Sequence, residues 1–244
     1  NTSIPICLHS SMKKLTCFDS FNVVSGFLNL VLKPEVWINQ LSYLIGLESI
    51  GISNESSGEL FMVEYSSPNT NKPLHLGHLR NIFLGDAVVS LLKSVGHKVV
   101  RTQIINDRGI HICKSMVAWK QYGEGKTPKS ENIKGDKFVG EYYILFNKIH
   151  NEQKKQLIDT GEDKDKAEEN TQIMLDAKHE LKNWEKNDKE TLKVWKMMNE
   201  WVYEGFESTY NLLGVSFDKN YYESQTYLLG KDIIKDGLNN NIFY

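Results

Sequence analysis

Short apolar runs and helical spacing alternate in the first part of the chain. Residues 21–32 carry apolar side chains at nearly every second position, which predicts one or two short strands. Residues 35–47 have large apolar side chains at the spacing of one helical face, namely Trp37, Leu41, Leu44 and Leu47. Residues 48–58 are rich in glycine and serine, which favours a linker. We therefore expect the end of a small α+β domain followed by a linker.

A strand–helix–strand pattern begins after residue 58. Residues 60–65 (LFMVEY) form a short apolar run that is typical of a buried parallel strand. A loop rich in turn residues follows, and residues 75–95 then have apolar positions at helical spacing, with Gly96 placed to end that helix. Residues 98–105 (KVVRTQII) are rich in β-branched side chains and predict a second strand. This order predicts a βαβ unit with parallel strands.

The second half of the chain is predominantly helical in its patterning. Residues 151–193 hold nine lysines against twelve acidic residues, and we interpret them as a solvated helical insertion rather than a binding tail. From residue 192 to 213, large apolar side chains recur every three or four positions. This spacing predicts an amphipathic helix whose aromatic residues belong to the core, with Gly214 at its end.

Composition excludes several classes of protein. Hydrophobic residues make up 40% and charged residues 25% of the 244 positions, so the chain is not a disordered one. The net charge of −2 excludes a strongly basic nucleic-acid module, although a local basic face could exist. Cys7, Cys17 and Cys113 lie far apart without a C-x-x-C pair, which argues against a disulfide scaffold and a structural zinc site. We expect a cytoplasmic protein, and no apolar stretch is long enough to cross a membrane.

The candidate chemistry lies in the loop and helix that follow the first predicted strand of the βαβ unit. Ligands of open parallel sheets bind beyond the carboxyl ends of the strands, and a helix N-terminus there attracts anions such as phosphate. His75 and His78 can both donate hydrogen bonds to phosphate oxygens, and Lys72 adds a cation. Gly77 has no side chain, so a flat ring such as adenine can approach its backbone.

These residues favour nucleotidyl transfer. Neither the spacing of a phosphate-binding P-loop nor that of a dinucleotide-binding loop is present. Histidine and lysine donors near an α-phosphate would stabilise the charge that develops when a carboxylate attacks phosphorus and pyrophosphate leaves. A single histidine in a helix is more often a surface or core residue. The H-x-G-H spacing directly after a strand and a polar loop makes that bland interpretation the weaker one here.

The same residues resemble a known family. His75-Leu76-Gly77-His78 is similar to the HIGH signature of class I aminoacyl-tRNA synthetases, and the longer string from Glu64 to Arg80 (EYSSPNTNKPLHLGHLR) resembles the arginyl-tRNA synthetases. The segments 106–111 (NDRGIH) and 192–229 resemble the bacterial members, especially those of Bacteroidetes. The resemblance covers about residues 21–244.

The resemblance implies a fold and a domain organisation. Residues 59–244 would be the first part of the Rossmann-like α/β catalytic domain of a class I synthetase, with a doubly wound parallel sheet and a helical insertion. Residues 1–58 would be the remnant of an N-terminal domain that contacts tRNA, together with a linker. The family's KMSKS-like loop and helical anticodon-binding domain have no counterpart, so we expect a fragment that does not aminoacylate alone. The start at Asn1 rather than Met agrees with that expectation.

The resemblance also implies an activity and its substrates. The family is an ATP-dependent ligase that activates L-arginine to arginyl-adenylate and transfers it to tRNA(Arg). By this resemblance, His75, His78 and Lys72 are the expected catalytic and ATP-binding residues, and Gly77 would lie against adenine. Mg²⁺ is expected to arrive with ATP, held by phosphates and water, without a metal site in the chain. A monomer is expected.

The expected arginine site lies just upstream of the HIGH-like segment. By the resemblance, Glu64 would pair with the guanidinium, Ser67 and Asn69 would hold the α-amino end, and Asp107, with Gly109, would border the pocket. A carboxylate can bind guanidinium through two parallel hydrogen bonds. The alternative is that Glu64 pairs with a framework cation, either Arg80 or Arg101.

Two other functions stay open from the sequence. A small-molecule adenylyltransferase uses the same H-x-G-H phosphate chemistry without tRNA, although Glu64, Ser67 and Asn69 would then have no amino acid to bind. A catalytically inactive fragment that binds ATP or a partner protein would carry the same motifs.

Overall fold

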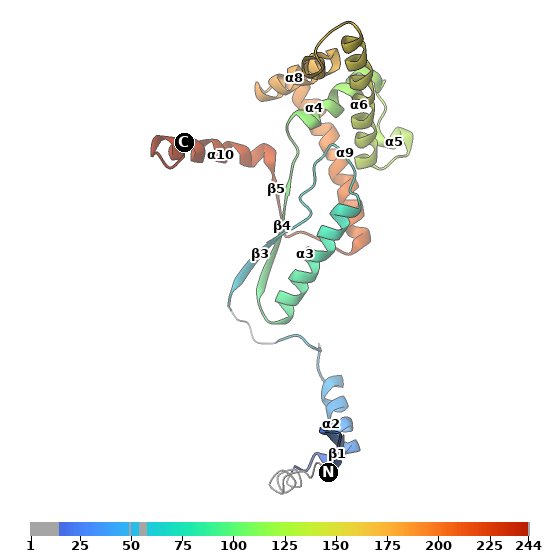
Figure 1. Ribbon diagram of the computed structural model, residues 1–244, viewed down its shortest axis with the longest axis vertical. Coiled ribbons are helices and arrows are strands. Elements are labelled where there is room, and N and C mark those ends of the chain that lie inside the picture. The colour runs from blue at the N-terminus through green and yellow to red at the C-terminus, as the bar shows by residue number, and fades with distance from the viewer. Residues whose placement is uncertain (1–14, 49, 54–57, 244) are drawn as a thin grey trace. The chain divides into compact units, whose positions relative to one another are not determined.

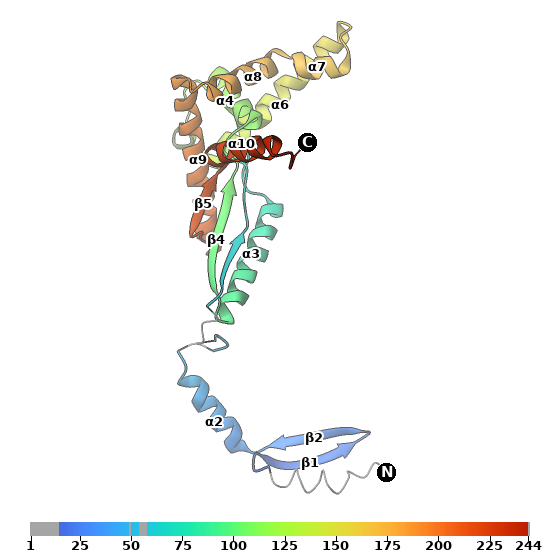
Figure 2. The same ribbon diagram turned by 90° about the vertical axis from the view of Figure 1, so that its left-hand side faces the viewer.

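The computed structural model of the chain describes residues 15–48, 50–53 and 58–243, which form parts of two compact units, residues 1–54 and 55–244. The first unit contains an antiparallel hairpin of β1 (Phe18–Val24) and β2 (Phe27–Leu32), followed by α2 (Pro34–Ile45) (Figure 2). Both turn residues, Ser25 and Gly26, have positive φ, the backbone that a tight hairpin turn needs. The predicted strands and helix are confirmed. Parts of the predicted linker, and Cys7, lie outside the described residues.

The second unit is built on a parallel sheet. Its strands are β3 (Leu60–Glu64), β4 (Lys98–Ile105) and β5 (Lys219–Tyr222), and all are parallel in the order β3-β4-β5 (Figure 1). Helix α3 (Leu76–Ser94) connects β3 to β4 and lies alongside both strands. The predicted βαβ unit is therefore confirmed, and Gly96 follows α3 with φ of 91°, as its predicted role at the helix end requires.

The prediction that residues 60–65 form a buried strand is wrong for most of its length. Leu60 is 67% exposed and Met62 is 63% exposed, whereas Tyr65, just after the strand, is 3% exposed. The physical reason is that β3 buries only one face: Leu60 and Met62 lie on the open face, whereas Val63, on the opposite face, packs against the buried core. Glu64 is also exposed, so the carboxylate that we expected at a buried strand end is in contact with solvent.

The remaining elements are helices, most of which lie beyond the carboxyl end of β4, while α9 runs back alongside the sheet (Figure 2). They are α4 (Ile110–Tyr122), α5 (Pro128–Glu131), α6 (Gly135–Asp159), α7 (Lys164–Asn170), α8 (Gln172–Glu185), α9 (Lys189–Leu213) and, after β5, α10 (Glu223–Asn239). The charged segment 151–193 is helical, as predicted. It is not merely solvated, because Ile173, Met174 and Ala177 join Phe146 in a small core of their own.

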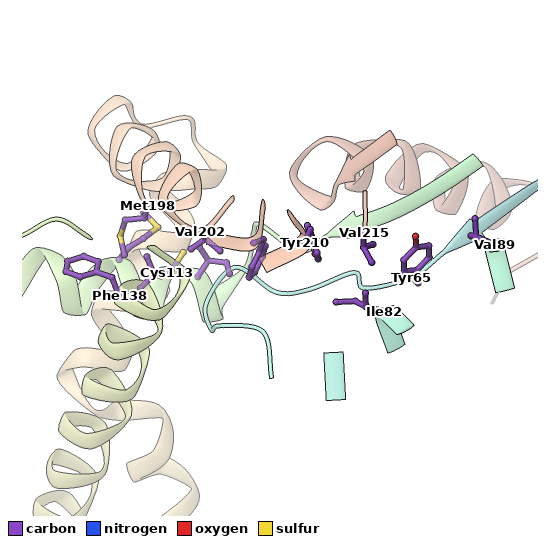
Figure 3. Close-up of a cluster of buried hydrophobic side chains, with 13 residues drawn as sticks. Tyr65, Ile82, Val89, Cys113, Phe138, Met198, Val202, Tyr210 and Val215 are labelled. Carbon is purple, nitrogen blue, oxygen red and sulfur yellow. The ribbon is translucent and has the colours of Figure 1, made fainter. Parts of the chain in front are cut away.

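The main core runs along α9. Phe138 and Met198 lie at one end, Val202 and Tyr210 follow, and Tyr65 lies toward the other end beside α3 (Figure 3). The amphipathic helix predicted for residues 192–213 is confirmed and begins at Lys189. Gly214 ends it in the left-handed conformation, with φ of 71°.

An ion pair joins β4 to the segment between α9 and β5. The Arg101 guanidinium donates two hydrogen bonds to the Asp218 carboxylate, at 3.0 Å from Nε and 2.7 Å from the terminal nitrogen. The backbone N–H of Arg101 also donates to this carboxylate, at 2.8 Å. These donors lower the pKa of Asp218 to about 2, the side-chain bond being the largest cause. Arg101 therefore has a fixed partner in the fold.

Replacing Gly85 tests the contact between α3 and the residue after β3. A methyl group at Gly85 would lie 2.3 Å from Cγ of Tyr65, and this ring is buried and cannot move aside. We expect Gly85→Ala to destabilise the chain by about 1–3 kcal/mol, the usual cost of overpacking, and to lower Tm by several degrees. Gly230→Ala in α10 is the control, since a methyl group there meets open space and should not lower Tm. Equal Tm values for both variants would contradict the packing.

Candidate active site

The loop after β3 is held against the extension of β4. The backbone N–H of Thr70 donates to the carbonyl of Asn106 at 3.0 Å, and the N–H of Asn106 donates to the carbonyl of Pro68 at 3.0 Å. Asn69 and Asn106 therefore form an isolated parallel bridge. The loop continues the parallel pairing beyond both strands, which places the predicted site residues at the carboxyl end of the sheet.

Glu64 and Ser67 are brought together at this edge. Ser67 Oγ donates to Glu64 Oε1 at 2.6 Å and accepts from the backbone N–H of Ile104 at 3.0 Å. One hydroxyl therefore fixes the Glu64 carboxylate relative to β4. Across the described residues, no cationic side chain lies within ion-pair distance of Glu64. The alternative pairing with Arg101 is wrong, because Asp218 occupies that guanidinium, and no bond to Arg80 forms.

His75 and His78 lie together at the N-terminus of α3. Their ring centres are 4.0 Å apart. The backbone N–H of Gly77 donates to His75 Nδ1 at 3.1 Å, and the N–H of His75 donates to His78 Nδ1 at 3.2 Å. Because both Nδ1 atoms accept, neither can carry a proton, and both neutral rings carry the proton on Nε2. Each histidine therefore has an Nε2–H donor that the helix cap does not use.

The electrostatics favour the neutral form of His78. Burial lowers its pKa first, and the neighbouring His75 and Lys72 lower it further. Lys72 also contributes, after burial and Lys114, to a lowered pKa of His111. The Lys72 ammonium thus lies close enough to act on two imidazoles. The loop and helix cap form a donor-rich site with a positive helix end.

Gly77 has a structural task that the sequence did not indicate. A side chain at this position would place its first carbon 3.0 Å from Cε1 and 3.1 Å from Nδ1 of His75. The missing side chain therefore makes room for the imidazole that caps the helix. Gly77 is itself exposed, so an outer ligand can still reach its backbone.

Asp107 has a different environment from the other predicted site residues. It is 1% exposed, and its carboxylate accepts from the hydroxyl of Tyr203 at 3.1 Å, the hydroxyl of Ser224 at 2.7 Å and the backbone N–H of Ser224 at 2.8 Å. Its carbonyl accepts from Trp195 Nε1 at 2.6 Å and Asn199 Nδ2 at 3.2 Å. Asp107 thus caps the first turn of α10 and binds α9 to the end of β4.

A cavity of about 280 Å³ lies at this second cluster. Its lining combines three aromatic rings with charged and polar side chains: Asp107, Trp195, Lys196, Asn199, Glu200, Tyr203, Tyr222, Ser224 and Gln225. Neither His75 nor His78 belongs to this lining. The sequence did not indicate Tyr203 or Ser224 as neighbours of Asp107, because no local spacing connects residues about a hundred positions apart.

The described residues contain neither a metal-ligand cluster nor a membrane-spanning helix. Within the portion of the chain that the structure describes, no group of three or more histidine, cysteine, aspartate or glutamate side chains could hold a metal ion. No helix in residues 15–48, 50–53 and 58–243 is both long and apolar enough to span a bilayer. Burial raises the pKa of Cys113 to about 12, so this thiol stays protonated and unreactive.

Sequence comparison identifies the family. Residues 48–242 match the family described as tRNA synthetases class I (R), catalytic domain. An arginine–tRNA ligase from Phocaeicola vulgatus is 49% identical over 234 residues, and the match covers 92% of this chain and 39% of that protein. Arginine–tRNA ligases from Amoebophilus asiaticus and Bacteroides fragilis are 48% and 49% identical, with 38% of each covered. The chain thus spans about two fifths of the length of these relatives.

Solved structures support the fold alone. Arginyl-tRNA synthetase from Thermus thermophilus superposes with a TM-score of 0.57 at 23% identity, over 93% of this chain and 34% of that one. The enzyme from Plasmodium falciparum gives a TM-score of 0.53 at 18% identity, over 91% and 36%. The predicted fold class, an α/β class I synthetase catalytic domain with a parallel sheet, is confirmed.

The protonation of the helix cap can be measured directly. We expect long-range ¹H–¹⁵N spectra to show the Nε2–H form for both His75 and His78, and a pKa of His78 below 6.5. Since the folded pKa is lowered, the stability that this cap contributes is present above pH 6.5 and is lost as the pH falls through the folded value. His179, on α8 outside the site, serves as the comparison ring. An Nδ1–H form of either cap histidine, or a raised His78 pKa, would contradict the structure.

Proposed function

The chain belongs to the class I arginyl-tRNA synthetases, and from this membership we propose that the whole protein is an arginine–tRNA ligase. It would activate L-arginine with ATP to arginyl-adenylate and pass the arginyl group to tRNA(Arg). The observation that carries the proposal is the adjacency of two parts of one loop. Its first part presents Glu64 fixed by Ser67, and its last part leads into two Nε2–H donors at a helix N-terminus.

The helix end accounts for the proposed chemistry at phosphorus. An oxygen of the arginine carboxylate attacks the α-phosphorus of ATP, and the bond to the β-phosphate bridging oxygen breaks so that pyrophosphate leaves. Negative charge grows on the phosphate oxygens during this step. The Nε2–H groups of His75 and His78, the free backbone N–H groups of α3 and the Lys72 ammonium are donors suited to that charge. Gly77, exposed between the two histidines, is proposed to lie against adenine.

The first part of the loop accounts for amino-acid recognition. Ser67 binds one oxygen of the Glu64 carboxylate and leaves Oε2 unoccupied. A guanidinium can use both carboxylate oxygens at once, because Oε1 keeps a free lone pair. Glu64 is therefore proposed to bind the arginine side chain, with Ser67 and Asn69 near the α-amino end. Asp107 lines the neighbouring cavity while it holds the cavity's walls together.

The partners follow from the same proposal. Mg²⁺ would enter with ATP and be held by phosphate oxygens and water, which Mg²⁺ prefers over an all-protein cage. The tRNA contact is proposed for residues 1–58 as well as for the catalytic domain. The proposed active form is a cytoplasmic monomer.

Two alternatives remain distinguishable from this proposal. A small-molecule adenylyltransferase would form an adenylate without arginine. A catalytically inactive ATP-binding chain would form none. Arginine-dependent ATP–pyrophosphate exchange by the whole protein, assayed with tRNA(Arg) present, separates all three, because only the ligase requires arginine for exchange.

The role of the helix cap is tested by His78→Ala in the whole protein. Loss of one preorganised donor should slow adenylate formation about 10²- to 10³-fold, as removal of an oxyanion donor does. Pyrophosphate exchange measures the rate, and the KM for arginine should change little because Glu64 is unaffected. His179→Ala on α8 is the control. Exchange by His78→Ala close to the wild-type rate would remove His78 from the proposed chemistry.

The role of Glu64 is tested by Glu64→Gln. An amide cannot offer two anionic oxygens to a guanidinium, so the KM for arginine should rise about 10- to 100-fold, the usual worth of a hydrogen bond to a charged group. The KM for ATP should stay within about twofold, an estimate that assumes independent sites. Glu168→Gln makes the same chemical change in α7, where Lys154 and His150 are the partners. Parallel changes in both KM values of Glu64→Gln would indicate a structural residue.

A further inference from the structure

The loop that follows Glu64 and contains Asn69 starts with an unfavourable backbone. Ser66 has φ of 68° and Ser67 has φ of 43°, so two consecutive residues other than glycine lie in the left-handed region. Each such residue costs about 1–2 kcal/mol unless its surroundings hold it. A contact that fixes Ser66 therefore also decides the conformation of Ser67.

One such contact comes from a residue 144 positions later in the chain. Ser66 Oγ lies 2.7 Å from the hydroxyl of Tyr210, on α9, and both residues are buried. The backbone N–H of Ser66 donates to Asn81 Oδ1 on α3, at 2.5 Å. Ser66 is thus held from two helices, and its side chain is held by Tyr210.

The other hydrogen bond of the Tyr210 hydroxyl decides which residue is the donor in its contact with Ser66. The Tyr210 hydroxyl donates to Gln103 Oε1 at 2.9 Å, and Gln103 Nε2 donates to Asn220 Oδ1 at 3.0 Å. Tyr210 has one proton, so Ser66 must be the donor in the bond between them. Burial is the largest cause that raises the pKa of Tyr210 to about 12, which keeps this proton in place. The chain of bonds runs from the loop through α9 to β4 and β5.

The segment Ser66–Ser67 also fixes the orientation of the Glu64 carboxylate. Ser67 Oγ must point at Glu64 and at the N–H of Ile104 simultaneously, and it does so at 2.6 Å and 3.0 Å. The left-handed pair of serines turns the backbone so that Ser66 faces the buried Tyr210 while Ser67 faces Glu64. A change in the Ser66 backbone would displace Ser67 and release the carboxylate.

We propose that Tyr210 is a positioning residue for amino-acid binding, which acts through Ser66 and Ser67 to hold the Glu64 carboxylate in its binding orientation. This inference rests on the proposed function, since it assigns Glu64 to the substrate guanidinium. Tyr210 is 2% exposed and does not need to touch the substrate. Sequence spacing connects it neither to the loop nor to Glu64.

The ring and the hydroxyl of Tyr210 have separate tasks. The ring packs edge-on against Phe217, with ring centres 5.1 Å apart, and belongs to the main core. The hydroxyl makes only the bonds to Ser66 and Gln103 among the residues that the structure describes. Tyr210→Phe keeps the ring and removes these two bonds, so it separates positioning from packing.

The experiment is steady-state kinetics of the whole protein with Tyr210→Phe, measured by pyrophosphate exchange. We expect the KM for arginine to rise about 5- to 10-fold, the worth of the buried hydrogen bond to Ser66, since only that one of the two lost bonds acts on Glu64. The KM for ATP should change less than about twofold, because the helix cap is untouched. Thr171→Val is the matched control, since it removes a buried hydroxyl that bonds His150 at 2.7 Å, in the helical insertion. It should lower Tm comparably and leave the KM for arginine unchanged.

A second pair of variants tests the route through Ser66. Ser66→Gly removes the hydroxyl and the penalty of the left-handed backbone together. In that background, adding Tyr210→Phe should raise the KM for arginine by less than about twofold, because the bond is already gone. If the rise in the KM for arginine in the double variant equalled the product of the rises in the two single variants, the route through Ser66 would be overturned. An unchanged KM in Tyr210→Phe, or an equal rise in Thr171→Val, would overturn the positioning role.

The result also separates this inference from the proposed function. If the whole protein shows no arginine-dependent pyrophosphate exchange, the proposed function fails and takes this inference with it. If exchange requires arginine and Glu64→Gln raises the KM for arginine while Tyr210→Phe does not, only the inference fails.

Discussion

A buried carboxylate at the end of β4 decides how the sheet and the helices of the second unit meet. An ionised group that is 1% exposed is costly unless every lone pair has a partner, and Asp107 obtains its partners from elements far away in the sequence. Tyr203 comes from α9, and Ser224 comes from the first turn of α10. The helix end favours the negative charge as well. If α9 or α10 moved away, the buried Asp107 carboxylate would lose a hydrogen-bond donor at a cost in free energy. This cost keeps both helices against the end of β4.

The site loop depends on the same arrangement. Helix α9 contacts Asp107 through Trp195, Asn199 and Tyr203. Farther along the same helix, Tyr210 forms a hydrogen bond with Ser66 in the loop. These positions share one face of the helix because successive members are separated by four, four and seven residues. The loop that joins the Glu64 carboxylate to the donor-rich helix cap is therefore held by α9.

Local chemistry could be predicted from the sequence, and long-range contacts could not. The βαβ unit and the proximity of His75 to His78 depend on spacing within about 45 residues, so the sequence pattern predicts both. Glu64 is exposed because its face of β3, shared with Leu60 and Met62, is uncovered, and an apolar run does not show which face of a strand is covered. Asp107 was predicted as a pocket residue from resemblance, yet its partners Tyr203 and Ser224 lie 96 and 117 positions away. The core beside the charged helices could not be predicted from the segment 151–193 alone, because Val117, Ala118 and Phe146 supply half of it from outside that segment.

The separation between Ser66 and Tyr210 has a consequence for biosynthesis. A ribosome adds about 5–20 residues per second, so the loop leaves it roughly 7 to 29 seconds before Tyr210, its buried partner 144 residues later, does. During that interval the serine pair has no partner from α9, and the left-handed backbone is the less favoured one. A nascent chain halted before residue 210 would thus hold the helix cap without the finished loop. The amino-acid site would therefore be completed only after α9 emerges and docks.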